Sequence, residues 1–187
     1  MAINLKLQIS NFKIRNLPIR MALNFKFQIS NLKKTTMTLL FPGSFDPFTT
    51  GHDDIVRRSL AFADRLVIAI GVHPTKKGLY SPDQRKADIE RVYAHETRVE
   101  VMVYEGLTTD LAQRIGADAI VRGVRNVTDF EYERNIAEVN RRLTGIETIL
   151  LFADPAHAAV SSSVVRELMS YGKDVTPFLP TNDETEE

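Results

Sequence analysis

The chain has 187 residues, of which 43% are hydrophobic, a length and composition that suit one domain with a well-buried core. It contains no cysteine, which excludes disulfides and thiolate metal sites. No apolar run in the sequence approaches the roughly 20 residues that cross a bilayer, so we expect no membrane partner.

The formal net charge of zero conceals an uneven distribution. Residues 1–36 carry seven basic side chains and no acidic one, whereas the remaining 151 residues carry 17 basic and 24 acidic side chains, a net charge of −7. An acidic body repels the phosphate backbone of nucleic acids. We therefore expect no nucleic acid partner.

The basic segment repeats itself. MAINLKLQISNFK at 1–13 returns as MALNFKFQISNLK at 21–33, and both copies have apolar residues at alternate positions, as half-buried strands do. Three interpretations are open: an added hairpin or adhesive arm, a targeting segment, or a stretch upstream of the functional start. The lack of a continuous apolar run, together with Pro18, disfavours a targeting segment. We favour a disordered extension or a mis-assigned start, with Met37 beginning the functional body.

From Thr38 the pattern alternates between short apolar runs and amphipathic stretches. In chain order it predicts a strand at 38–41, a helix at 51–64, a strand at 65–71, a helix at 82–96, a strand at 99–103, a helix at 107–116, a strand at 119–123, a helix at 128–143, a strand at 148–152 and a helix at 161–169. This alternation indicates an α/β, Rossmann-like, doubly wound fold, in which helices cover both faces of a five-stranded parallel sheet. We expect the domain to span 37–180, before a polar tail at 181–187.

Polar or cationic residues follow every predicted strand. The carboxyl ends of parallel strands lie on one edge of the sheet, where ligands bind. The cations expected at this edge are Lys76, Arg122, Arg125 and Arg166. They bring positive charge to an acidic body, as a polyanionic small ligand requires, and the predicted helix starts at 51–52 and 161–163 add N–H donors for phosphate oxygens. The sequence therefore predicts a phosphate-binding site.

Most of these features also have a purely structural interpretation. Ser161–Ser163 could serve only to cap a helix, and the lysine pair at 76–77 could belong to a solvated loop. His73 and His95 show no spacing to acidic residues that would suit a metal site. His52 differs, because it lies in the first turn of a helix, where its imidazole can point toward the phosphates and donate a hydrogen bond.

Two segments resemble the signatures of the nucleotidylyltransferase superfamily. TTGH at 49–52 matches its [HT]-x-G-H motif, and SSSVVR at 161–166 resembles its S-S-[ST]-x-x-R motif. The phosphopantetheine adenylyltransferase family is indicated by GSFDP at 43–47 and, more specifically, by RGVR at 122–125 followed by DFEYE at 129–133. The resemblance covers nearly all of the chain after the first 36 residues, in the same order.

Members of this family join ATP to 4′-phosphopantetheine in coenzyme A biosynthesis, giving dephospho-coenzyme A and pyrophosphate. The resemblance implies that this chain is a nucleotidyltransferase of the same kind, in the cytoplasm, with Mg²⁺ held through the ATP phosphates and not by protein ligands. It also implies a homohexamer that coenzyme A inhibits by feedback at the same pocket.

The resemblance further implies roles for individual residues. His52 is expected to stabilise the in-line transition state, while Lys76 and Arg122 hold the acceptor phosphate. The residues expected to bind phosphopantetheine are Ser44, Lys76, Thr108 and Arg122. Those expected to bind ATP are Ser44, Phe45, His52, Gly123, Val124, Arg125, Glu133, His157, Ala158, Ala159, Val160, Ser161, Ser162 and Ser163. The chain departs from the family at 157–160, where the family usually has an aromatic residue and a phenylalanine.

Two other functions compete with this one. Transfer to another phosphorylated acceptor, such as nicotinate mononucleotide or glycerol phosphate, would suit the superfamily signatures, but the segment at 122–133 disfavours it. A non-catalytic nucleotide or coenzyme A sensor would keep the same pocket without turnover. The presence of both His52 and Lys76 favours an enzyme.

Overall fold

A computed structural model describes residues 36–73, 75 and 77–181. The expected N-terminal extension and polar tail lie outside these residues, apart from Thr36 and Thr181, and so does Lys76. None of the helices in the described part of the chain is both long enough and apolar enough to cross a bilayer.

The predicted strands and helices are confirmed in type and order. They are β1 (Thr38–Gly43), α3 (Thr50–Ser59), β2 (Arg65–Gly71), α4 (Pro82–Val92), β3 (Val99–Tyr104), α5 (Thr108–Ile115), β4 (Ala119–Val124), α6 (Val127–Thr144), β5 (Glu147–Phe152) and α7 (Ser162–Ser170). A short 3₁₀ helix that was not predicted, η2 (Thr176–Phe178), follows them. The largest difference is at α3, which ends at Ser59 and not at residue 64. Beyond it the backbone tightens, because Ala61 and Phe62 donate to carbonyls three residues back.

The five strands form one parallel sheet in the order β3-β2-β1-β4-β5, which confirms the doubly wound fold. The chain builds outward from β1 to β3 on one side and then returns to place β4 on the other side of β1. The strand order therefore reverses between β1 and β4. In open α/β sheets, ligands bind beyond the carboxyl ends of the strands at this reversal.

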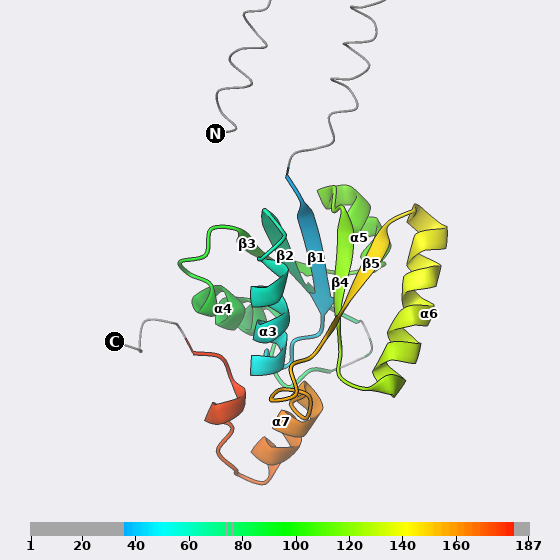
Figure 1. Ribbon diagram of the computed structural model, residues 1–187. Coiled ribbons are helices and arrows are strands. Elements are labelled where there is room, and N and C mark those ends of the chain that lie inside the picture. Colours follow the sequence, from blue (N-terminus) through cyan, green and yellow to red (C-terminus); the bar gives the residue numbers. More distant parts are fainter. Residues whose placement is uncertain (1–35, 74, 76, 182–187) are drawn as a thin grey trace, which may run out of the picture. The chain divides into compact units, whose positions relative to one another are not determined.

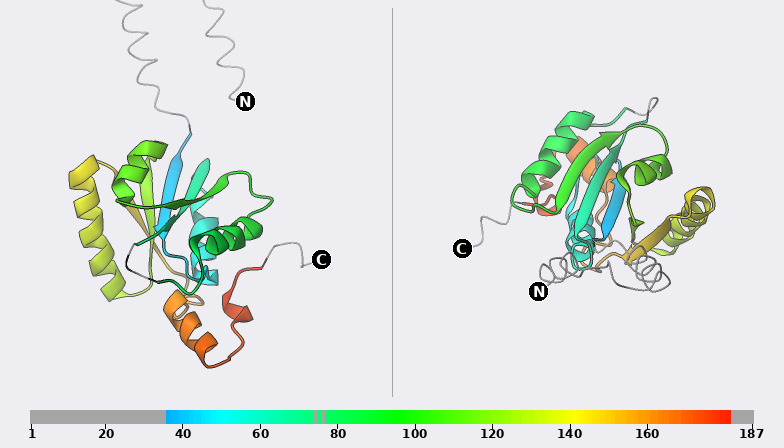
Figure 2. Two further views of the ribbon diagram at one scale, coloured as in Figure 1. Left: turned by 180° about the vertical axis from the view of Figure 1, so that it is seen from behind. Right: turned by 90° about the horizontal axis from the view of Figure 1, so that it is seen from above.

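Alternate residues of each central strand supply two separate cores. On β1, Leu39 and Phe41 pack with α3 and α4, whereas Leu40 packs with Leu111 and Ala112 of α5. The two views of Figure 2 show helices on both faces of the sheet accordingly. Because the central strands are apolar on both faces, polar chemistry is confined to their ends.

Helix α7 closes the carboxyl end of the sheet. Figure 1 shows it beyond the ends of β1 and β4, next to the loop that follows β1. This contact is specific, because the Ser162 hydroxyl donates to the Pro47 carbonyl over 2.8 Å. Segments 115 residues apart in sequence thus meet at the reversal of strand order.

Candidate active site

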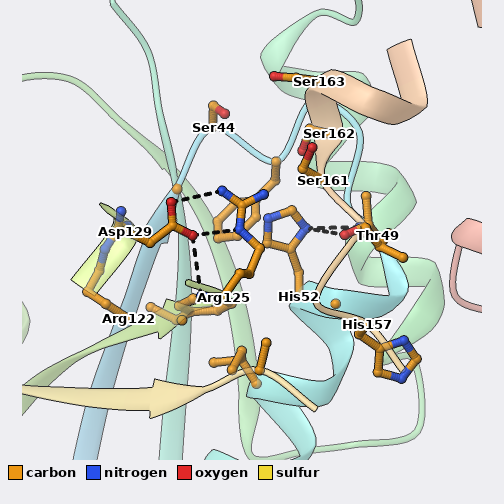
Figure 3. A pocket seen from close by; sticks show the side chains of 18 of the residues that line it. Ser44, Thr49, His52, Arg122, Arg125, Asp129, His157, Ser161, Ser162 and Ser163 are labelled. Atoms are coloured by element: carbon orange, nitrogen blue, oxygen red, sulfur yellow. Dashed lines mark hydrogen bonds and ion pairs between the residues drawn. The ribbon is translucent and has the colours of Figure 1, made fainter. Parts of the chain in front are cut away.

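A pocket of about 470 Å³ opens at the carboxyl ends of β1 and β4, between the first turns of α3 and α7 (Figure 3). This volume lies within the usual range for small-molecule sites. The predicted site residues that line it are Ser44, Phe45, His52, Arg122, Gly123, Arg125, Glu133, His157, Val160, Ser161, Ser162 and Ser163. Residues from separate segments of the sequence therefore lie together around this pocket.

Other predicted site residues do not line this pocket. Val124 is 1% exposed. Thr108 lies at the start of α5, and its hydroxyl is 2.8 Å from that of Tyr104 at the end of β3. Ala158 and Ala159 are also outside the lining. Lys76 is not among the described residues, so its predicted role stays a prediction.

His52 is fixed by the start of its own helix. Thr49 is the N-cap of α3, and its backbone N–H donates to Nδ1 of His52 over 3.0 Å, with the Thr49 hydroxyl 2.9 Å from the same nitrogen. This is a capping box in which histidine replaces the usual Glu or Gln at the third position. Since Nδ1 accepts, the proton of the neutral ring is on Nε2, which is left as a donor.

Aromatic rings enclose the imidazole. The ring of Phe48 stacks on it with centroids 5.4 Å apart, and that of Phe45 meets it edge to face at 5.1 Å. Desolvation of the ring, followed by the positive charges of Arg125 and Arg122, lowers the pKa of His52 from 6.5 to about 4. The side chain is therefore a neutral hydrogen-bond donor at physiological pH.

Arg122 is held in one orientation by Glu133. Its Nε and Nη2 donate to the two carboxylate oxygens over 2.8 and 2.5 Å, and its Nη1 donates to the Pro42 carbonyl. Glu133 is only 6% exposed, so this bidentate pair keeps a buried carboxylate compensated. A guanidinium has five N–H groups, and two therefore remain for a ligand.

Arg125 has a carboxylate partner as well. Its Nε donates to Asp129 over 2.7 Å, one turn further along the chain, and this bond lowers the pKa of the Asp129 carboxyl. Asp129 is itself fixed by the N-cap of α6, where its N–H donates to the Asn126 side chain. Arg122 on β4 and Arg125 just after it thus both line the pocket paired with an acid, and Figure 3 shows the pair of Arg125 with Asp129.

The loop after β1 is held by side chains from other parts of the chain. Three carbonyls of this loop, and that of Pro42 near the end of β1, each accept a hydrogen bond from a different side chain. These bonds join Arg122 to Pro42, Arg85 to Ser44, Arg166 to Asp46 and Ser162 to Pro47. The donors come from β4, α4 and α7, so the loop is fixed from three directions.

Phe45 holds an unusual backbone conformation within this loop. Its φ is +48°, a left-handed value that costs a residue with a side chain about 1 to 3 kcal/mol. The ring then packs over Gly43, where a Cβ would lie 2.7 Å from Phe45 Cζ. Glycine is required here because any side chain would displace the ring that contacts His52.

Asp46 joins the loop after β1 to the one after β2. Its carboxylate accepts the backbone N–H groups of Leu79 and Tyr80 over 2.7 and 2.9 Å, and it is 6% exposed. The segment that follows Lys76 is thereby held next to the pocket loop. Two N–H donors on one carboxylate are a strong, charge-assisted contact.

The serines at the start of α7 have separate structural tasks. Ser161 is the N-cap and accepts the Val164 N–H, which confirms the capping interpretation for this residue. Ser162 donates to the Pro47 carbonyl, and the Ser163 hydroxyl accepts from Arg166. The N–H groups of the first turn still point along the helix axis toward the pocket end, where an anion is favoured. Capping and anion binding are thus compatible here.

Two contributors to this site were not predicted as such. Asp129 was part of a recognised motif, and its spacing of four from Arg125 could have indicated an ion pair. Thr49 appears in the sequence only as part of the TTGH motif, although its N–H decides the tautomer of His52. The described residues hold no cluster of three or more His, Cys, Asp or Glu that could bind a metal ion.

A family model described as cytidylyltransferase-like matches residues 40–168. The chain is 52% identical over 141 residues to the phosphopantetheine adenylyltransferase of Phocaeicola vulgatus, a match that covers 75% of this chain and 93% of the relative. The enzyme of the same name from Porphyromonas gingivalis is also 52% identical, with 92% of the relative covered. That from Flavobacterium psychrophilum is 48% identical, with 93% covered.

Among solved structures, the chain resembles a bifunctional NMN adenylyltransferase/ADP ribose pyrophosphatase from Francisella tularensis, complexed with AMP and a Mn ion. The TM-score is 0.60 at 18% sequence identity, and the match covers 80% of this chain and 46% of the other. At this identity the likeness shows the fold alone.

The lowered pKa of His52 predicts that folding stability depends on pH. Between pH 6.5 and about 4 the unfolded chain binds a proton at His52 that the folded chain does not, so stability falls as the pH falls through this window. The full loss is on the order of 3 kcal/mol. In His52→Gln the side chain can still accept the Thr49 N–H but does not titrate, so this loss should be absent.

The measurement is urea unfolding of both proteins at pH 7 and pH 4.5, with attention to the difference between them, in which other titrating groups cancel. The stability advantage of wild type over His52→Gln should shrink at the lower pH. An NMR titration that gives His52 a pKa near 6.5 would contradict the expectation.

Proposed function

The chain belongs to the phosphopantetheine adenylyltransferase family of cytidylyltransferase-like nucleotidyltransferases, and we propose that the pocket at β1 and β4 is its active site. It transfers the adenylyl group of ATP to 4′-phosphopantetheine, giving dephospho-coenzyme A and pyrophosphate. The family predicted from the motifs is thereby confirmed. One observation carries the proposal for the site: His52, Arg122 and the start of α7 line one pocket at the reversal of strand order.

The chemistry asks for positioning more than for covalent work. A phosphate oxygen of 4′-phosphopantetheine attacks the α-phosphorus of ATP, in line with the bond to the β-phosphate, and pyrophosphate leaves with the electrons of that bond. Charge builds on the oxygens around the α-phosphorus as this happens. Fixed donors that point at these oxygens therefore lower the barrier.

We assign the role of such a donor to His52. Its Nδ1 is occupied by Thr49, so the Nε2–H is the group that is left to donate to an α-phosphate oxygen. With its pKa near 4, the ring donates without acting as an acid at neutral pH. Packing against Phe45 and Phe48 fixes its orientation before substrate binds, which is the condition for preorganised stabilisation.

We assign Arg122 and Lys76 to the acceptor phosphate. Arg122 keeps two N–H groups after its bonds to Glu133 and Pro42, enough for a bidentate contact. Glu133 was expected to contact ATP, but its carboxylate oxygens are both engaged, so we propose that it also orients Arg122. Lys76 would complete the neutralisation of the incoming phosphate.

Arg125 and the start of α7 suit the triphosphate. The N–H groups of Ser162 and Ser163 lie in the first helical turn, which favours the leaving pyrophosphate. Mg²⁺, when bound, would neutralise part of the triphosphate charge. The pocket carboxylates Asp129 and Glu133 are each paired with an arginine, so we propose that the ion is held through the phosphates.

We further propose that the enzyme works in the cytoplasm as a homohexamer, and that coenzyme A inhibits it by occupying the same pocket. An exposed apolar face on α6 supports an oligomer. Its residues are Tyr132, Ile136, Val139 and Leu143, at helical spacing. Such a continuous face is typical of an interface between protein chains.

The activity is tested by pyrophosphate release from ATP and Mg²⁺. The purified chain should release pyrophosphate with 4′-phosphopantetheine, and neither with nicotinate mononucleotide nor without an acceptor. Turnover with nicotinate mononucleotide instead would show that the acceptor is not 4′-phosphopantetheine. ATP binding without turnover on any acceptor would favour a nucleotide sensor.

The role of His52 predicts a large kinetic defect in His52→Ala. Removing one preorganised donor should lower kcat by about 10²- to 10³-fold with a small change in KM, because the bond forms mainly in the transition state. His73→Ala is the matched control, since His73 is exposed and outside the pocket, and it should behave as wild type. An active His52→Ala enzyme would exclude this role.

The lysine pair allows a sharp test of the acceptor site. Lys76→Ala should raise the KM for 4′-phosphopantetheine by about tenfold or more and leave the KM for ATP nearly unchanged, since one charge-assisted contact contributes about 1.5 to 3 kcal/mol. Lys77→Ala removes the same charge at the next position and should change neither constant. Equal effects of the two substitutions would show that only the overall charge of the loop matters.

The oligomer is tested by light scattering after size exclusion. Wild type should elute as a hexamer, and Val139→Arg should dissociate it because a charge would be buried in the interface. Tyr171→Arg, at a still more exposed position directly after α7, should leave the hexamer intact. A monomeric wild-type protein would refute the proposal.

A further inference from the structure

Among the described residues, Arg85 is the one buried cation, and it does not line the active-site pocket. It lies in α4 and is only 7% exposed. Its Nη1 donates to the Ser44 carbonyl over 2.6 Å and its Nε to the Ser81 carbonyl over 3.4 Å. Within the described residues it forms no ion pair, so its charge is met by carbonyl oxygens alone. Burying a guanidinium without a carboxylate partner costs free energy, so its position calls for a functional explanation.

Of the four side chains that hold the loop after β1, Arg85 is the one that does not line the pocket. Arg122, Arg166 and Ser162 all do. Arg85 lines a separate cavity, which it shares with Phe45 and Phe48. It therefore reaches the loop from outside the active-site pocket.

The bond to Ser44 fixes the orientation of one peptide group. The peptide between Ser44 and Phe45 is trans, so its N–H points opposite to its carbonyl. With the carbonyl directed toward Arg85, the Phe45 N–H is directed away from it. Ser44 and Phe45 both line the pocket, so this N–H and the Ser44 hydroxyl are available to a phosphate there.

The same bond supports His52. Phe45 has a left-handed backbone that relaxes if the preceding peptide is free to rotate, and its ring contacts the imidazole at 5.1 Å. Loss of the anchor would thus disturb a phosphate-binding peptide and the packing of the transition-state donor together. Displacements of about 1 Å at such sites are enough to lower turnover 10²-fold.

We propose that Arg85 is a positioning residue for the adenylyl transfer, which acts from behind the loop by holding the Ser44–Phe45 peptide toward the triphosphate. The proposal rests on the proposed function for its kinetic consequences. Its effect on ATP binding does not require the transfer reaction.

The test compares Arg85→Met and Arg85→Lys with Arg91→Met. Arg91 lies on the same helix and lines the same second cavity, but its side chain is 65% exposed and paired with Asp88, so it controls for loss of charge on α4. Arg85→Met should lower kcat/KM for ATP by about 100-fold and weaken ATP binding about tenfold in calorimetry. Arg85→Lys should recover about tenfold in kcat/KM, because an ammonium can still donate to one carbonyl. Arg91→Met should stay within twofold of wild type.

A purely structural Arg85 would lower the melting temperature without changing the kinetics or the ATP affinity of the folded enzyme. Kinetic constants are therefore measured well below the melting temperature of each variant, with circular dichroism to confirm folding. If Arg85→Met does not fold, Arg85→Lys decides, because it should still lose about tenfold. Wild-type kcat/KM and ATP affinity in a folded Arg85 variant would overturn the proposal. Inactive wild type with normal ATP binding would instead count against the proposed function, and calorimetry would still test Arg85.

Discussion

The carbonyl groups of the loop after β1 impose the constraint on which the site depends. A strand can satisfy its carbonyls by pairing, but the chain leaves the sheet at Gly43, and buried carbonyls without partners are costly. Side chains of α4 and α7 supply the missing donors in the loop, and Arg122 of β4 donates to the carbonyl of Pro42 near the end of β1. Each donor satisfies a carbonyl and at the same time brings a distant element to the pocket. The same hydrogen bonds therefore satisfy the backbone carbonyls and assemble the site.

The charged side chains in the pocket also serve two purposes at once. Arg122 and Arg125 must be available to anionic substrates, yet two unpaired cations would repel each other before substrate binds. Glu133 and Asp129 compensate these arginines and also fix their planes, leaving further N–H groups for ligands. Among the described residues that line it, three arginines and two carboxylates give the site a net charge of only +1, and its donors are directional. It is thus suited to bind phosphates by geometry as well as by net charge.

Much of this arrangement could be predicted from the sequence. The alternating apolar runs gave the sheet and its helices, and rules for parallel sheets placed His52, Arg122 and Ser161–Ser163 on one edge. Partners that depend on three-dimensional contact were out of reach: no local pattern links Arg85 to a carbonyl 41 positions earlier. The end of α3 was misplaced for a related reason, since Phe62 continues the helical spacing but the backbone has already tightened. Periodicity reports which face is buried, and it does not report which buried polar atom needs a donor.

The capping of α3 by His52 has a consequence for how the enzyme meets changes in cellular acidity. A histidine is ordinarily the side chain that registers a shift between pH 5 and 8, yet here burial and the charges of Arg125 and Arg122 lower the pKa of His52 to about 4, and Thr49 donates to the nitrogen that would take the extra proton. Phosphate monoesters lose their second proton near pH 6. The acceptor substrate, and not the imidazole, is then the component that titrates in this range. The supply of the coenzyme precursor would respond to acidification through the ionisation of the metabolite itself and not through that of His52.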